Sequence, residues 1–562
     1  MSPVDDTSGR AAGPSAAERH DAWLAHDPDE TTRAELRELV EQAGRGDESA
    51  RRELVDAFGA ELRFGTAGVR AKLGPGPNRM NRVVVRRITA GVAHWLHEDG
   101  RSGGRVVVGY DGRRNSADFA ADVAAVLKAS GFDPVLYDRP IPTPVLAYAA
   151  KVEAAAAAVM ITASHNPADD NGYKLYDATG SQILPDTAMR VEALIRSGRG
   201  EPSLEPVTAT SSGKILSSYR ARVLERLGSR GGRHRGDIRI VYSAMHGVGG
   251  DTFTALCADA GFDDVYVVRE QHHPNGSFPT TRFPNPEEPG ALDLAVRLAV
   301  GVDADLILAN DPDADRCAVA LPDPAGGYRR LSGDTVGALL LWWLVRCGRL
   351  PAGSTVASSV VSSELLADMA AHYHLLHEQT LTGFKWIARV PALRFGYEEA
   401  IGYCLDPEAV SDKDGVSAAI EICAMAATLR GEGRDLAWAL GEIDDLFGAH
   451  RQRQLTVARG TTGGSPAAAG ILDDLPDRIG GLEVVEHYRL DEPGRLPWPT
   501  EGMAVRLGGD GDVRRARVLV RPSGTEPKVR VYLEVVAASA DVAEKHLEVL
   551  AGDLHAIITP SY

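Results

Sequence analysis

The chain has 562 residues, of which 44% are hydrophobic and 25% are charged, proportions that are ordinary for a soluble globular protein. At roughly 150 residues per domain, this length predicts about four domains. Acidic residues outnumber lysine and arginine by 78 to 61, a formal net charge of −17. This balance argues against a nucleic-acid-binding protein and still permits small anionic ligands.

The cysteines and the apolar segments indicate the compartment. Five cysteines are scattered along the chain without a CxxC pair, which favours a reducing environment. Residues 1–20 lack the apolar core of a signal peptide. The most apolar stretch, 336–345, is too short to cross a membrane and predicts a buried helix. We therefore expect a cytoplasmic protein, a monomer or homodimer, with no membrane or nucleic-acid partner.

The first three quarters of the chain predict alternating strands and helices. Residues up to about 17 have the composition of a disordered tail, and the dense alternating charge of 19–58 predicts exposed helices before the first domain. Alternation of strands with helices indicates βαβ units and mostly parallel sheets. The expected strands are 106–111, the apolar run before Ser164, 238–245, 304–311 and 355–363, and the expected helices include 117–130 and 252–260.

The pattern changes towards the C-terminus. Short strands at 504–507, 516–520 and 529–535 precede a final helix at 541–554, which suggests a smaller α+β domain. A glycine-rich segment, 460–470, has the composition of a flexible loop. We expect a tail and helical extension, three α/β domains and this last domain, with the bounds 1–58, 59–212, 213–330, 331–450 and 451–562.

Ser164 is the most informative residue. It lies in the segment MITASHNPADDNGYK (160–174), directly after an apolar run that predicts a buried strand. Parallel α/β folds place their active sites at such strand ends. His165 and Lys174 add a proton carrier and a fixed cation, which suits a serine that carries a phosphoryl group better than one that attacks an acyl carbon.

A second motif, Asn-Asp-Pro-Asp-Ala-Asp-Arg at 310–316, follows another predicted strand. Its three carboxylates at alternate positions can converge on one hard cation. An EF-hand is excluded, because Arg316 and Pro322 stand where that motif needs glycine and glutamate. A loop with few protein ligands leaves coordination sites open, as Mg²⁺ prefers when it also contacts phosphate. The alternative is an inert, solvated acidic turn.

The segment Arg-Pro-Ser-Gly-Thr-Glu-Pro-Lys at 521–528 combines hydroxyls, a glycine and two cations, a composition that suits a phosphate, although it also fits a hairpin turn. Lys385 in TGFKW, and Glu398 or Glu399 in GYEEAIG, place a cation and acids on predicted loops where a glutamate can bind sugar hydroxyls. For any single glutamate, a solvated side chain is the simpler interpretation.

Two glycine-rich segments are weaker signals. HGVGG at 246–250 predicts a tight turn between a strand and a helix, and RFGTAGVR at 63–70 is basic but lacks a Walker lysine. Ser164, the candidate metal-binding loop at 310–316 and the candidate phosphate-binding segment at 521–528 thus lie far apart in the sequence. Two anion sites suit a substrate that binds by either end, as a sugar does when one serine must reach both of its phosphate positions.

These motifs resemble the α-D-phosphohexomutase superfamily. TASHNP with NGYK, DPDADR, TGFKW, EEAIGY and RPSGTEPK occur in the order seen in that family, over residues 60 to 540. FGTAGVR, TGFKWI, EEAIGY and DKDGVSAA are most similar to the branch that holds phosphoglucomutase 2 and phosphopentomutase-like enzymes. The resemblance implies four domains around a central cleft, three similar mixed α/β domains and a smaller C-terminal α+β domain.

The resemblance also implies roles for individual residues. Ser164 would be a phosphoserine, and its phosphoryl oxygen would complete a Mg²⁺ site formed by Asp311, Asp313 and Asp315, with one ion per chain. Arg70, His165, Lys174 and Arg316 would surround the reacting phosphoryl group, with Lys174 or His165 as the proton shuttle. Glu398 would contact the sugar, and the non-reacting phosphate would be bound by Arg521, Ser523, Gly524, Thr525 and Lys528.

The implied reaction interconverts sugar 1-phosphate and 6-phosphate through a bound bisphosphate, with free bisphosphate as activator. Many hexose-specific members have Glu-x-Ser in the sugar loop, whereas this chain has Glu398-Glu399-Ala400. Losing that hydroxyl weakens discrimination at one sugar oxygen. A phosphopentomutase therefore stays open beside a phosphoglucomutase or phosphomannomutase. A synthase that phosphorylates Ser164 from another phosphoryl donor and makes sugar bisphosphate is a separate alternative.

Two interpretations come from other classes. A serine hydrolase would pair Ser164 with His165, but the chain has no GxSxG motif there. Neighbouring side chains on an extended backbone also point apart, so we expect no direct contact between the two. A sugar-phosphate sensor without catalysis is the other alternative.

Overall fold

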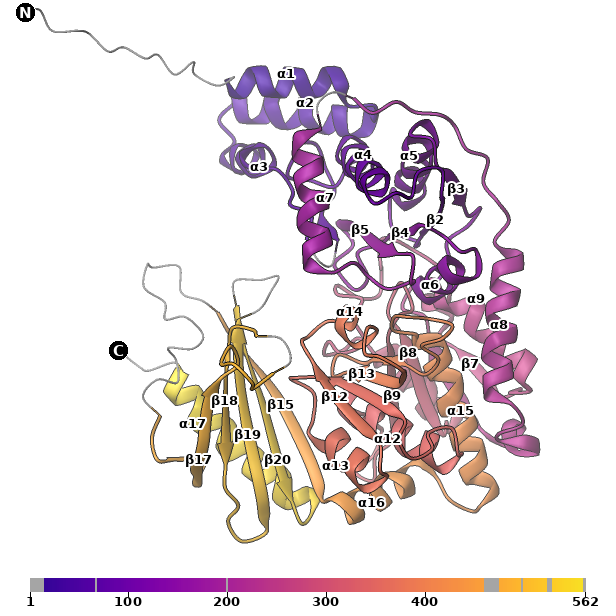
Figure 1. The fold of residues 1–562 in the computed structure, drawn as a ribbon, viewed down its shortest axis with the longest axis vertical. Coiled ribbons are helices and arrows are strands. Elements are labelled where there is room, and N and C mark those ends of the chain that lie inside the picture. Colours follow the sequence, from indigo (N-terminus) through magenta and orange to yellow (C-terminus); the bar gives the residue numbers. More distant parts are fainter. Residues whose placement is uncertain are drawn as a thin grey trace, which may run out of the picture.

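The structure is a computed structural model that describes residues 15–65, 68–198, 201–458, 475–496, 499–522 and 528–558. A helical extension at the N-terminus is followed by three α/β units and a C-terminal β-rich unit that lies beside the third (Figure 1). We number these parts by their strands: unit I holds β1 to β5, unit II β6 to β10, unit III β11 to β14 and unit IV β15 to β20.

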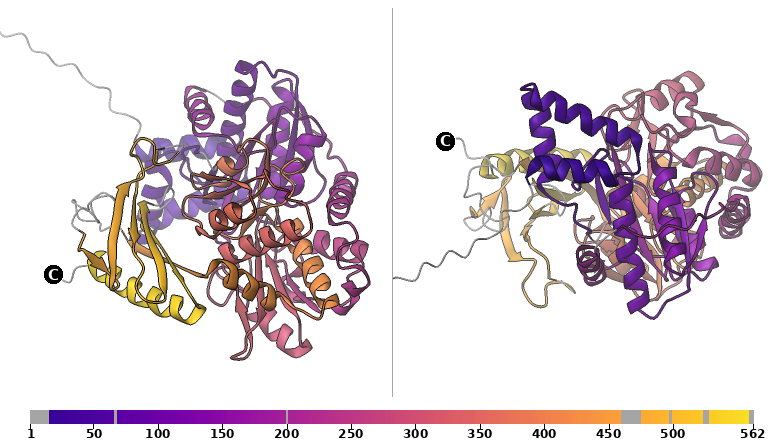
Figure 2. Two further views of the ribbon diagram at one scale, coloured as in Figure 1. Left: turned by 60° about the horizontal axis from the view of Figure 1, so that its bottom comes forward. Right: turned by 90° about the horizontal axis from the view of Figure 1, so that it is seen from above.

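The N-terminal extension contains α1 (Ala16–His26), α2 (Glu30–Gly44) and α3 (Glu48–Gly59). Each helix begins after a side chain that accepts a hydrogen bond from a backbone N–H of the first turn, namely Ser15, Asp29 and Asp47. Helices were expected here, but not their burial. Trp23, Leu36 and Phe58 are buried in the hydrophobic core of unit I. The extension is therefore half-buried and packs against unit I (Figure 2).

Unit I has a five-stranded sheet in the order β1-β5-β4-β2-β3. Strands β3, β2 and β4 are parallel, and β5 and β1 add antiparallel strands at one edge. The strands are β1 (Val69–Lys72), β2 (Arg105–Tyr110), β3 (Asp133–Leu136), β4 (Ala157–Ile161) and β5 (Asp170–Asp177). The helices are α4 (Arg82–Glu98), α5 (Ser116–Ala129), α6 (Thr143–Val152) and α7 (Pro185–Ser197).

Unit II repeats this arrangement with the order β10-β9-β8-β6-β7, in which β7, β6 and β8 are parallel. Its strands are β6 (Ile240–Ser243), β7 (Val265–Val267), β8 (Leu306–Asn310), β9 (Cys317–Pro322) and β10 (Tyr328–Arg330). Its helices are α8 (Gly213–Leu227), the 3₁₀ helix η1 (Gly232–Asp237), α9 (Gly249–Ala260), α10 (Arg269–His272) and α11 (Asp293–Val302).

Unit III has the shorter order β12-β11-β13-β14, with β12, β11 and β13 parallel. Its strands are β11 (Thr355–Ser359), β12 (Leu376–Thr380), β13 (Leu393–Glu398) and β14 (Gly402–Cys404). Its helices are α12 (Gly333–Arg346), α13 (Leu365–His372), α14 (Phe384–Ile387), α15 (Gly415–Gly431) and α16 (Leu436–Phe447).

The three units therefore share one plan: three parallel strands, the third of which turns back into an antiparallel fourth. This confirms three similar mixed α/β units but corrects the expectation of mostly parallel sheets, because only three neighbouring strands of each unit are parallel. The predicted strand 355–363 is also too long, because β11 ends at Ser359 and the chain turns there.

Unit IV is an antiparallel sheet in the order β15-β20-β19-β18-β17-β16, against which α17 (Ala540–Ile558) packs. Three strands and the last helix were predicted, whereas β15, β16 and β17 were not. The segment 460–470 lies outside the residues that the structure describes. The strands are β15 (Ala449–Ala458), β16 (Arg478–Ile479), β17 (Leu482–Arg489), β18 (Met503–Leu507), β19 (Val513–Pro522) and β20 (Lys528–Ala537).

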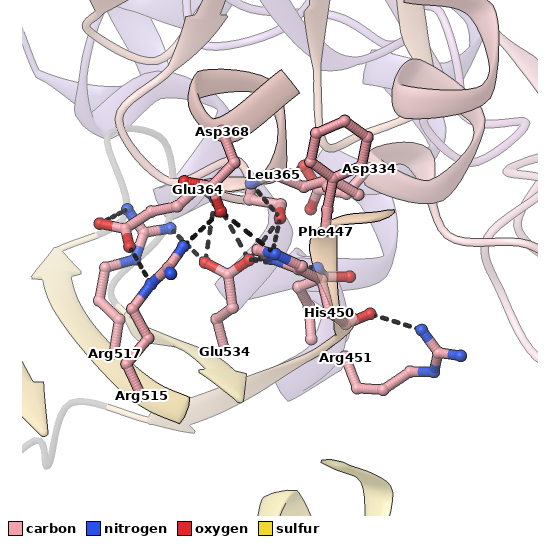
Figure 3. A network of polar contacts seen from close by, with 12 residues as sticks. Asp334, Glu364, Leu365, Asp368, Phe447, His450, Arg451, Arg515, Arg517 and Glu534 are labelled. Carbon is pink, nitrogen blue, oxygen red and sulfur yellow. Dashed lines mark hydrogen bonds and ion pairs between the residues drawn. The ribbon is translucent and has the colours of Figure 1, made fainter. Parts of the chain in front are cut away.

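A buried polar network joins unit IV to unit III (Figure 3). Glu534 of β20 accepts hydrogen bonds from the hydroxyl of Ser363 and, at 3.1 Å, from the backbone N–H of Glu364, at the start of α13. It also lies 2.9 Å from Nδ1 of His450 and 3.4 Å from Nη2 of Arg517. This network fixes one end of the unit IV sheet on unit III.

The apolar helix α12 lies in the core, as its sequence predicts: eleven of its residues, from Gly333 to Leu344, are buried. Its side chains belong to one hydrophobic cluster that extends from α6 of unit I through units II and III. Among the described residues, no helix has the length and apolarity needed to cross a membrane.

Candidate active site

Three loops at the same topological position carry the chemically informative residues. Each connects the third parallel strand of a unit to its antiparallel fourth: β4 to β5 with Ser164, β8 to β9 with the three aspartates, and β13 to β14 beside Glu398 and Glu399. Each loop also has one non-glycine residue in the left-handed backbone region, namely Ser164 (φ 52°), Ala314 (φ 58°) and Ile401 (φ 53°). Such conformations carry strain that surrounding contacts must hold, and they gather at functional sites.

Ser164 is buried, and its hydroxyl donates to Oδ2 of Asp311 at 2.9 Å. Its backbone N–H donates to Oγ1 of Thr162 at 2.8 Å, which helps to hold the strained turn. Nδ1 of His165 lies 3.1 Å from the same hydroxyl oxygen. The expectation that neighbouring side chains would point apart was therefore wrong. It assumed an extended backbone, whereas the positive φ of Ser164 turns its side chain towards His165.

Arg113, which was not identified from the sequence, binds the backbone of the loop that carries Ser164. Its guanidinium donates to the backbone carbonyls of Ser164 and Asn166, both at 2.6 Å, and to that of Pro167 at 2.7 Å. The buried carboxylate of Asp111 lies 3.3 Å away. No local motif marks this arginine, because its partners lie more than fifty residues later in the chain.

The three aspartates are completely buried and converge. Asp311, Asp313 and Asp315 each offer a carboxylate oxygen within 4.8 Å of the others. Nζ of Lys174 lies 2.6 Å from Oδ2 of Asp313 and 3.2 Å from Oδ2 of Asp315. The Thr143 hydroxyl donates to Asp313 at 2.8 Å. The inert solvated turn is therefore wrong, because none of the three side chains is exposed to solvent.

Two oxygens of this triad have no hydrogen-bond partner in the part of the chain that the structure describes. Oδ1 of Asp313 and Oδ1 of Asp315 are buried without a hydrogen bond to any described residue. Burial alone would raise the pKa of Asp313, but the charge of Lys174 and the hydrogen bonds with Asp311, Lys174 and Thr143 together outweigh it, and the pKa is lowered. Burial and the two neighbouring carboxylates raise the pKa of Asp311. Oxygen-only ligands with unsatisfied atoms fit a hard divalent cation.

The HGVGG turn supports the metal loop. It connects β6 to α9, as predicted, and the N–H of Val248 donates to the carbonyl of Pro312 at 2.9 Å. A Cβ at Gly247 would lie 2.4 Å from the backbone of Pro312, so only glycine permits this approach. The turn therefore has a packing role.

Cations surround the serine and the triad. Nη1 of Arg70 donates to the side-chain oxygen of Asn166 at 3.4 Å. Nε of Arg316 lies 3.9 Å from Asp315, and its Nη1 lies 3.6 Å from the partly buried carboxylate of Glu287. The Nε atoms of both arginines are buried without a hydrogen-bond partner among the described residues. They are available to an anion.

Lys413 is a further cation that the sequence did not single out. Its side chain is 8% exposed, and its Nζ lies 3.4 Å from Oδ2 of Asp315 and 3.9 Å from Oε1 of Glu398. It therefore joins the metal loop to the sugar loop. Its place in DKDGVSAA, a segment that carries the resemblance, is the only sequence signal for it.

In the sugar loop the two glutamates differ. Glu399 accepts a hydrogen bond from Ser359 at 2.9 Å, and its burial raises its pKa to about 7. Glu398 faces Lys413, and Lys385 is close enough to interact with Glu398 electrostatically. Burial lowers the pKa of Lys385. Of the two, Glu398 lies nearer the metal loop.

The candidate phosphate-binding segment at 521–528 is described only in part. Arg521, at the end of β19, donates to the hydroxyl of Thr382, three residues before Lys385. Its Nε is buried and has no hydrogen-bond partner in the described part of the chain. Ser523, Gly524, Thr525 and the side chain of Lys528 lie outside the described residues. Arg521 thus brings the end of unit IV against the Thr382–Lys385 segment of unit III.

The structure therefore gathers Ser164, His165, Lys174, Asp311, Asp313, Asp315 and Arg316 from units I and II. Glu398 and Lys413 of unit III adjoin this group, and Arg521 adjoins unit III from unit IV. Units I to IV thus contribute their residues in the same order as the motifs occur along the chain. The roles assigned to these residues stay predictions.

Comparison with known proteins agrees with this arrangement. The phosphoglucomutase/phosphomannomutase family matches in four parts: alpha/beta/alpha domain I at residues 61–201, domain II at 218–326, domain III at 332–442 and the C-terminal domain at 471–550.

Relatives in this family have several names. A probable phosphomannomutase of Haemophilus influenzae is 39% identical over 466 residues, covering 81% of this chain and 93% of that protein. A phosphoglucomutase of Staphylococcus haemolyticus is 32% identical, covering 85% and 91%. The phosphopentomutase of Mus musculus is 32% identical, covering 94% and 91%.

Among solved structures, a putative phosphomannomutase from Thermus thermophilus superposes with a TM-score of 0.71 at 25% identity, covering 89% of this chain and 99% of that one. The four family domains, the full-length relatives and the shared fold confirm the resemblance read from the motifs. The chain belongs to the phosphoglucomutase/phosphomannomutase family and is a phosphosugar mutase, an isomerase that acts on small sugar phosphates.

Proposed function

We propose that this mutase interconverts the 1-phosphate and 6-phosphate of a hexose, glucose or mannose, through a phosphorylated Ser164 and an enzyme-bound bisphosphate. The observation that carries the proposal is the buried Ser164 hydroxyl, 2.9 Å from Asp311 in a triad with unpaired oxygens. A second anion site at Arg521 supports a substrate that binds by either end.

Ser164 would donate its phosphoryl group to the free hydroxyl of a sugar monophosphate and take back the other phosphate after the bisphosphate reorients. His165, whose Nδ1 lies 3.1 Å from the hydroxyl oxygen, would accept or return a proton. Lys174 is paired with two carboxylates and would position charge. Arg70 and Arg316 would bind phosphoryl oxygens through guanidinium groups whose Nε atoms have no partner in the described residues.

Asp311, Asp313 and Asp315 would hold one Mg²⁺, because their donor atoms are all oxygens and two of them are unsatisfied. When bound, the ion supplies positive charge that offsets the charge of the transferring phosphoryl group.

The sugar and its second phosphate would lie between units III and IV. Glu398 would accept hydrogen bonds from sugar hydroxyls, and Lys385 and Arg521 would contribute positive charge near the non-reacting phosphate. The segment 523–528, with Ser523, Gly524, Thr525 and Lys528, would complete that phosphate site on the strength of its composition.

A phosphopentomutase is the second candidate. Relatives with that name are 32% identical over more than nine tenths of this chain. Ala400 lacks the hydroxyl found in hexose-specific members, and Glu399 is already bonded to Ser359. A loop with fewer groups for the sugar discriminates less against a shorter one.

The test is turnover followed by ³¹P NMR on glucose 1-phosphate, mannose 1-phosphate and ribose 1-phosphate, each with its bisphosphate as activator and with Mg²⁺. The proposal predicts that kcat/KM is highest for a hexose. Preference for ribose 1-phosphate establishes the second candidate, and net accumulation of bisphosphate from a different phosphoryl donor establishes a synthase. If the protein bound these sugar phosphates but isomerised none of the three, it would be a sugar-phosphate sensor without catalysis.

We also propose that the enzyme works in the cytoplasm, as a monomer or homodimer. All five cysteines are free thiols in the structure, which suits a reducing compartment.

A further inference from the structure

A second cluster of metal-binding side chains lies in unit II, apart from the aspartate triad. It consists of Asp251, in the first turn of α9, His272, the last residue of α10, and His273. Each residue offers one donor atom, and these atoms lie within 4.8 Å of one another. Neither the predicted roles nor the family resemblance uses any of the three.

The distances between the donor atoms are close to those between the ligands of one metal ion. Nε2 of His272 lies 3.4 Å from Oδ1 of Asp251, and Nδ1 of His273 lies 3.9 Å from the same oxygen. Ligands of a tetrahedral zinc ion, at about 2.1 Å from the metal, are about 3.4 Å apart. Small side-chain rotations would therefore bring all three donors to coordination distance.

Packing orients one of the histidines. A Cβ at Gly250 would lie 3.1 Å from the ring of His272 and 2.3 Å from its carbonyl oxygen, so the ring lies directly over a glycine of α9. Its Nδ1 is buried and has no hydrogen-bond partner among the described residues, whereas Nε2 faces Asp251. The ring thus presents one nitrogen to the cluster.

The other two ligands are open to solvent. The side chains of His273 and Asp251 are 76% and 80% exposed, whereas that of His272 is 14% exposed. Three protein ligands with an open side leave at least one position for water or an added ligand. An ion can enter without any rearrangement of the core.

We propose that Asp251, His272 and His273 form a second metal site, for a transition-metal ion of the zinc class. Two imidazoles and one carboxylate select zinc-class ions over Mg²⁺, which prefers oxygen ligands such as the aspartate triad. The two sites of unit II therefore differ in the ion that each selects.

The site adjoins the segment that supports the serine loop. Pro274, the next residue, packs on Gly112, where a Cβ would lie 2.5 Å from it. Gly276 approaches the backbone of Arg113, and the Arg113 guanidinium lies 4.9 Å from the ring of Phe278. Because Arg113 holds the Ser164 carbonyl, an ion at His272 and His273 would stabilise the contact between units I and II that supports the active serine.

The test is calorimetric titration of the full-length enzyme with ZnCl₂ in excess Mg²⁺, which keeps the triad occupied. We expect one Zn²⁺ per chain, bound at least about tenfold more weakly by His272→Ala and by His273→Ala, since even outer-shell partners of a metal affect affinity by about 10–100-fold. Asp251→Asn should weaken binding too. The control His487→Ala, an exposed histidine of β17, should bind like the parent.

Absorption spectroscopy with Co²⁺ tests the ligands, and thermal unfolding tests whether the variants fold. Co²⁺ bound to the parent should give the visible d–d absorption of a low-coordinate nitrogen site, absent from His272→Ala. Thermal unfolding without zinc should be the same for parent and variants. Zinc affinity within twofold of the parent in both histidine variants would overturn the proposal, and so would loss of zinc binding in Asp313→Asn with no loss in the histidine variants.

Discussion

Two buried polar clusters of this enzyme have similar composition but differ in how many of their polar atoms are hydrogen-bonded within the protein. Around the aspartate triad, two carboxylate oxygens and the Nε atoms of Arg70 and Arg316 have no hydrogen-bond partner among the described residues. In the network that joins units III and IV, both oxygens of Glu534 are bonded, and Arg517 donates to the carbonyl of Ser362 at 2.6 Å.

The difference separates a site that binds a ligand from one that stabilises the fold. A buried polar atom without a partner costs free energy, so it persists where an ion or substrate completes it. In the network between units III and IV, Nε2 of His450 has no hydrogen bond to a described residue either, but it lies 3.4 Å from Oδ2 of Asp368, so this network makes most of its contacts within the protein and fixes one geometry. Burial and charge alone do not distinguish the two clusters. The hydrogen bonding of their individual oxygen and nitrogen atoms does.

The largest effect is expected from Ser164→Ala. If Ser164 carries the phosphoryl group, the variant should lose mutase turnover by at least about 10³-fold, because removal of a covalent nucleophile removes the pathway itself. Turnover by the coupled assay should be compared with Ser130→Ala, whose half-buried hydroxyl bonds only within α5. Residual activity within tenfold of the parent would refute the assignment.

Next in size is Asp313→Asn. Removing one of three hard anionic ligands should weaken Mg²⁺ binding and lower kcat/KM at limiting Mg²⁺ by at least about 100-fold. Excess Mg²⁺ should restore part of the activity, and chelation should abolish that of the parent. Asp263→Asn, on the surface of unit II, is the control. A parent enzyme that is insensitive to chelators would contradict the metal assignment.

Lys413→Met tests the cation that sequence reasoning missed. Because Lys413 joins Asp315 to Glu398, the variant should lose about 10- to 100-fold in kcat/KM, as expected for one electrostatic group beside a reacting phosphate. Exposed Lys214, changed to Met, should have no effect. Equal kinetics for the two variants would show that Lys413 has only a structural role.

In the interface network, Glu534→Ala should destabilise the docking of unit IV by about 3–5 kcal/mol, because it removes the nearest carboxylate from the buried cation Arg517. Hydrogen exchange of β19 and β20 amides measures the loss. Glu544→Ala breaks an exposed pair with Arg453 and should cost less than about 1 kcal/mol. Similar exchange rates in the two variants would show that the network does not hold the unit.

The smallest effect is a pH dependence of the same docking. Burial alone would lower the pKa of His450, but its contacts with Asp368 and Glu534 outweigh burial and raise it. Because the pKa is raised in the folded state, protonated His450 stabilises the docking fully at a pH below its unfolded pKa of about 6.5. This contribution is lost as the pH rises through the folded-state pKa. As the pH rises above about 6.5, the parent should therefore lose protection in β20 more steeply than His450→Gln. Parallel pH slopes would argue against a charged His450.

The catalytic motifs could be predicted because each is contiguous and ends a strand. Ser164 to Lys174 and Asn310 to Arg316 have their chemistry within one short segment, so strand-end placement sufficed to identify them. Strands β15 and β17 were missed because charged residues alternate along them, as in His450 to Gln454, and weaken the apolar signal of a strand.

What could not be predicted depends on tertiary contact. Arg113 meets the Ser164 loop across fifty residues, and Lys413 meets Asp315 across nearly a hundred. No propensity in the sequence predicts the left-handed backbone of Ser164, which places His165 against its hydroxyl. These features arise from the packing of units against each other.

The most direct test of the account is peptide mapping by mass spectrometry of the enzyme after incubation with glucose 1,6-bisphosphate. We expect one phosphoryl group per chain, on Ser164, and a ³²P label carried there should pass to the sugar when unlabelled glucose 6-phosphate is added. A phosphoryl group on another residue, or none in an enzyme that turns over, would contradict the account.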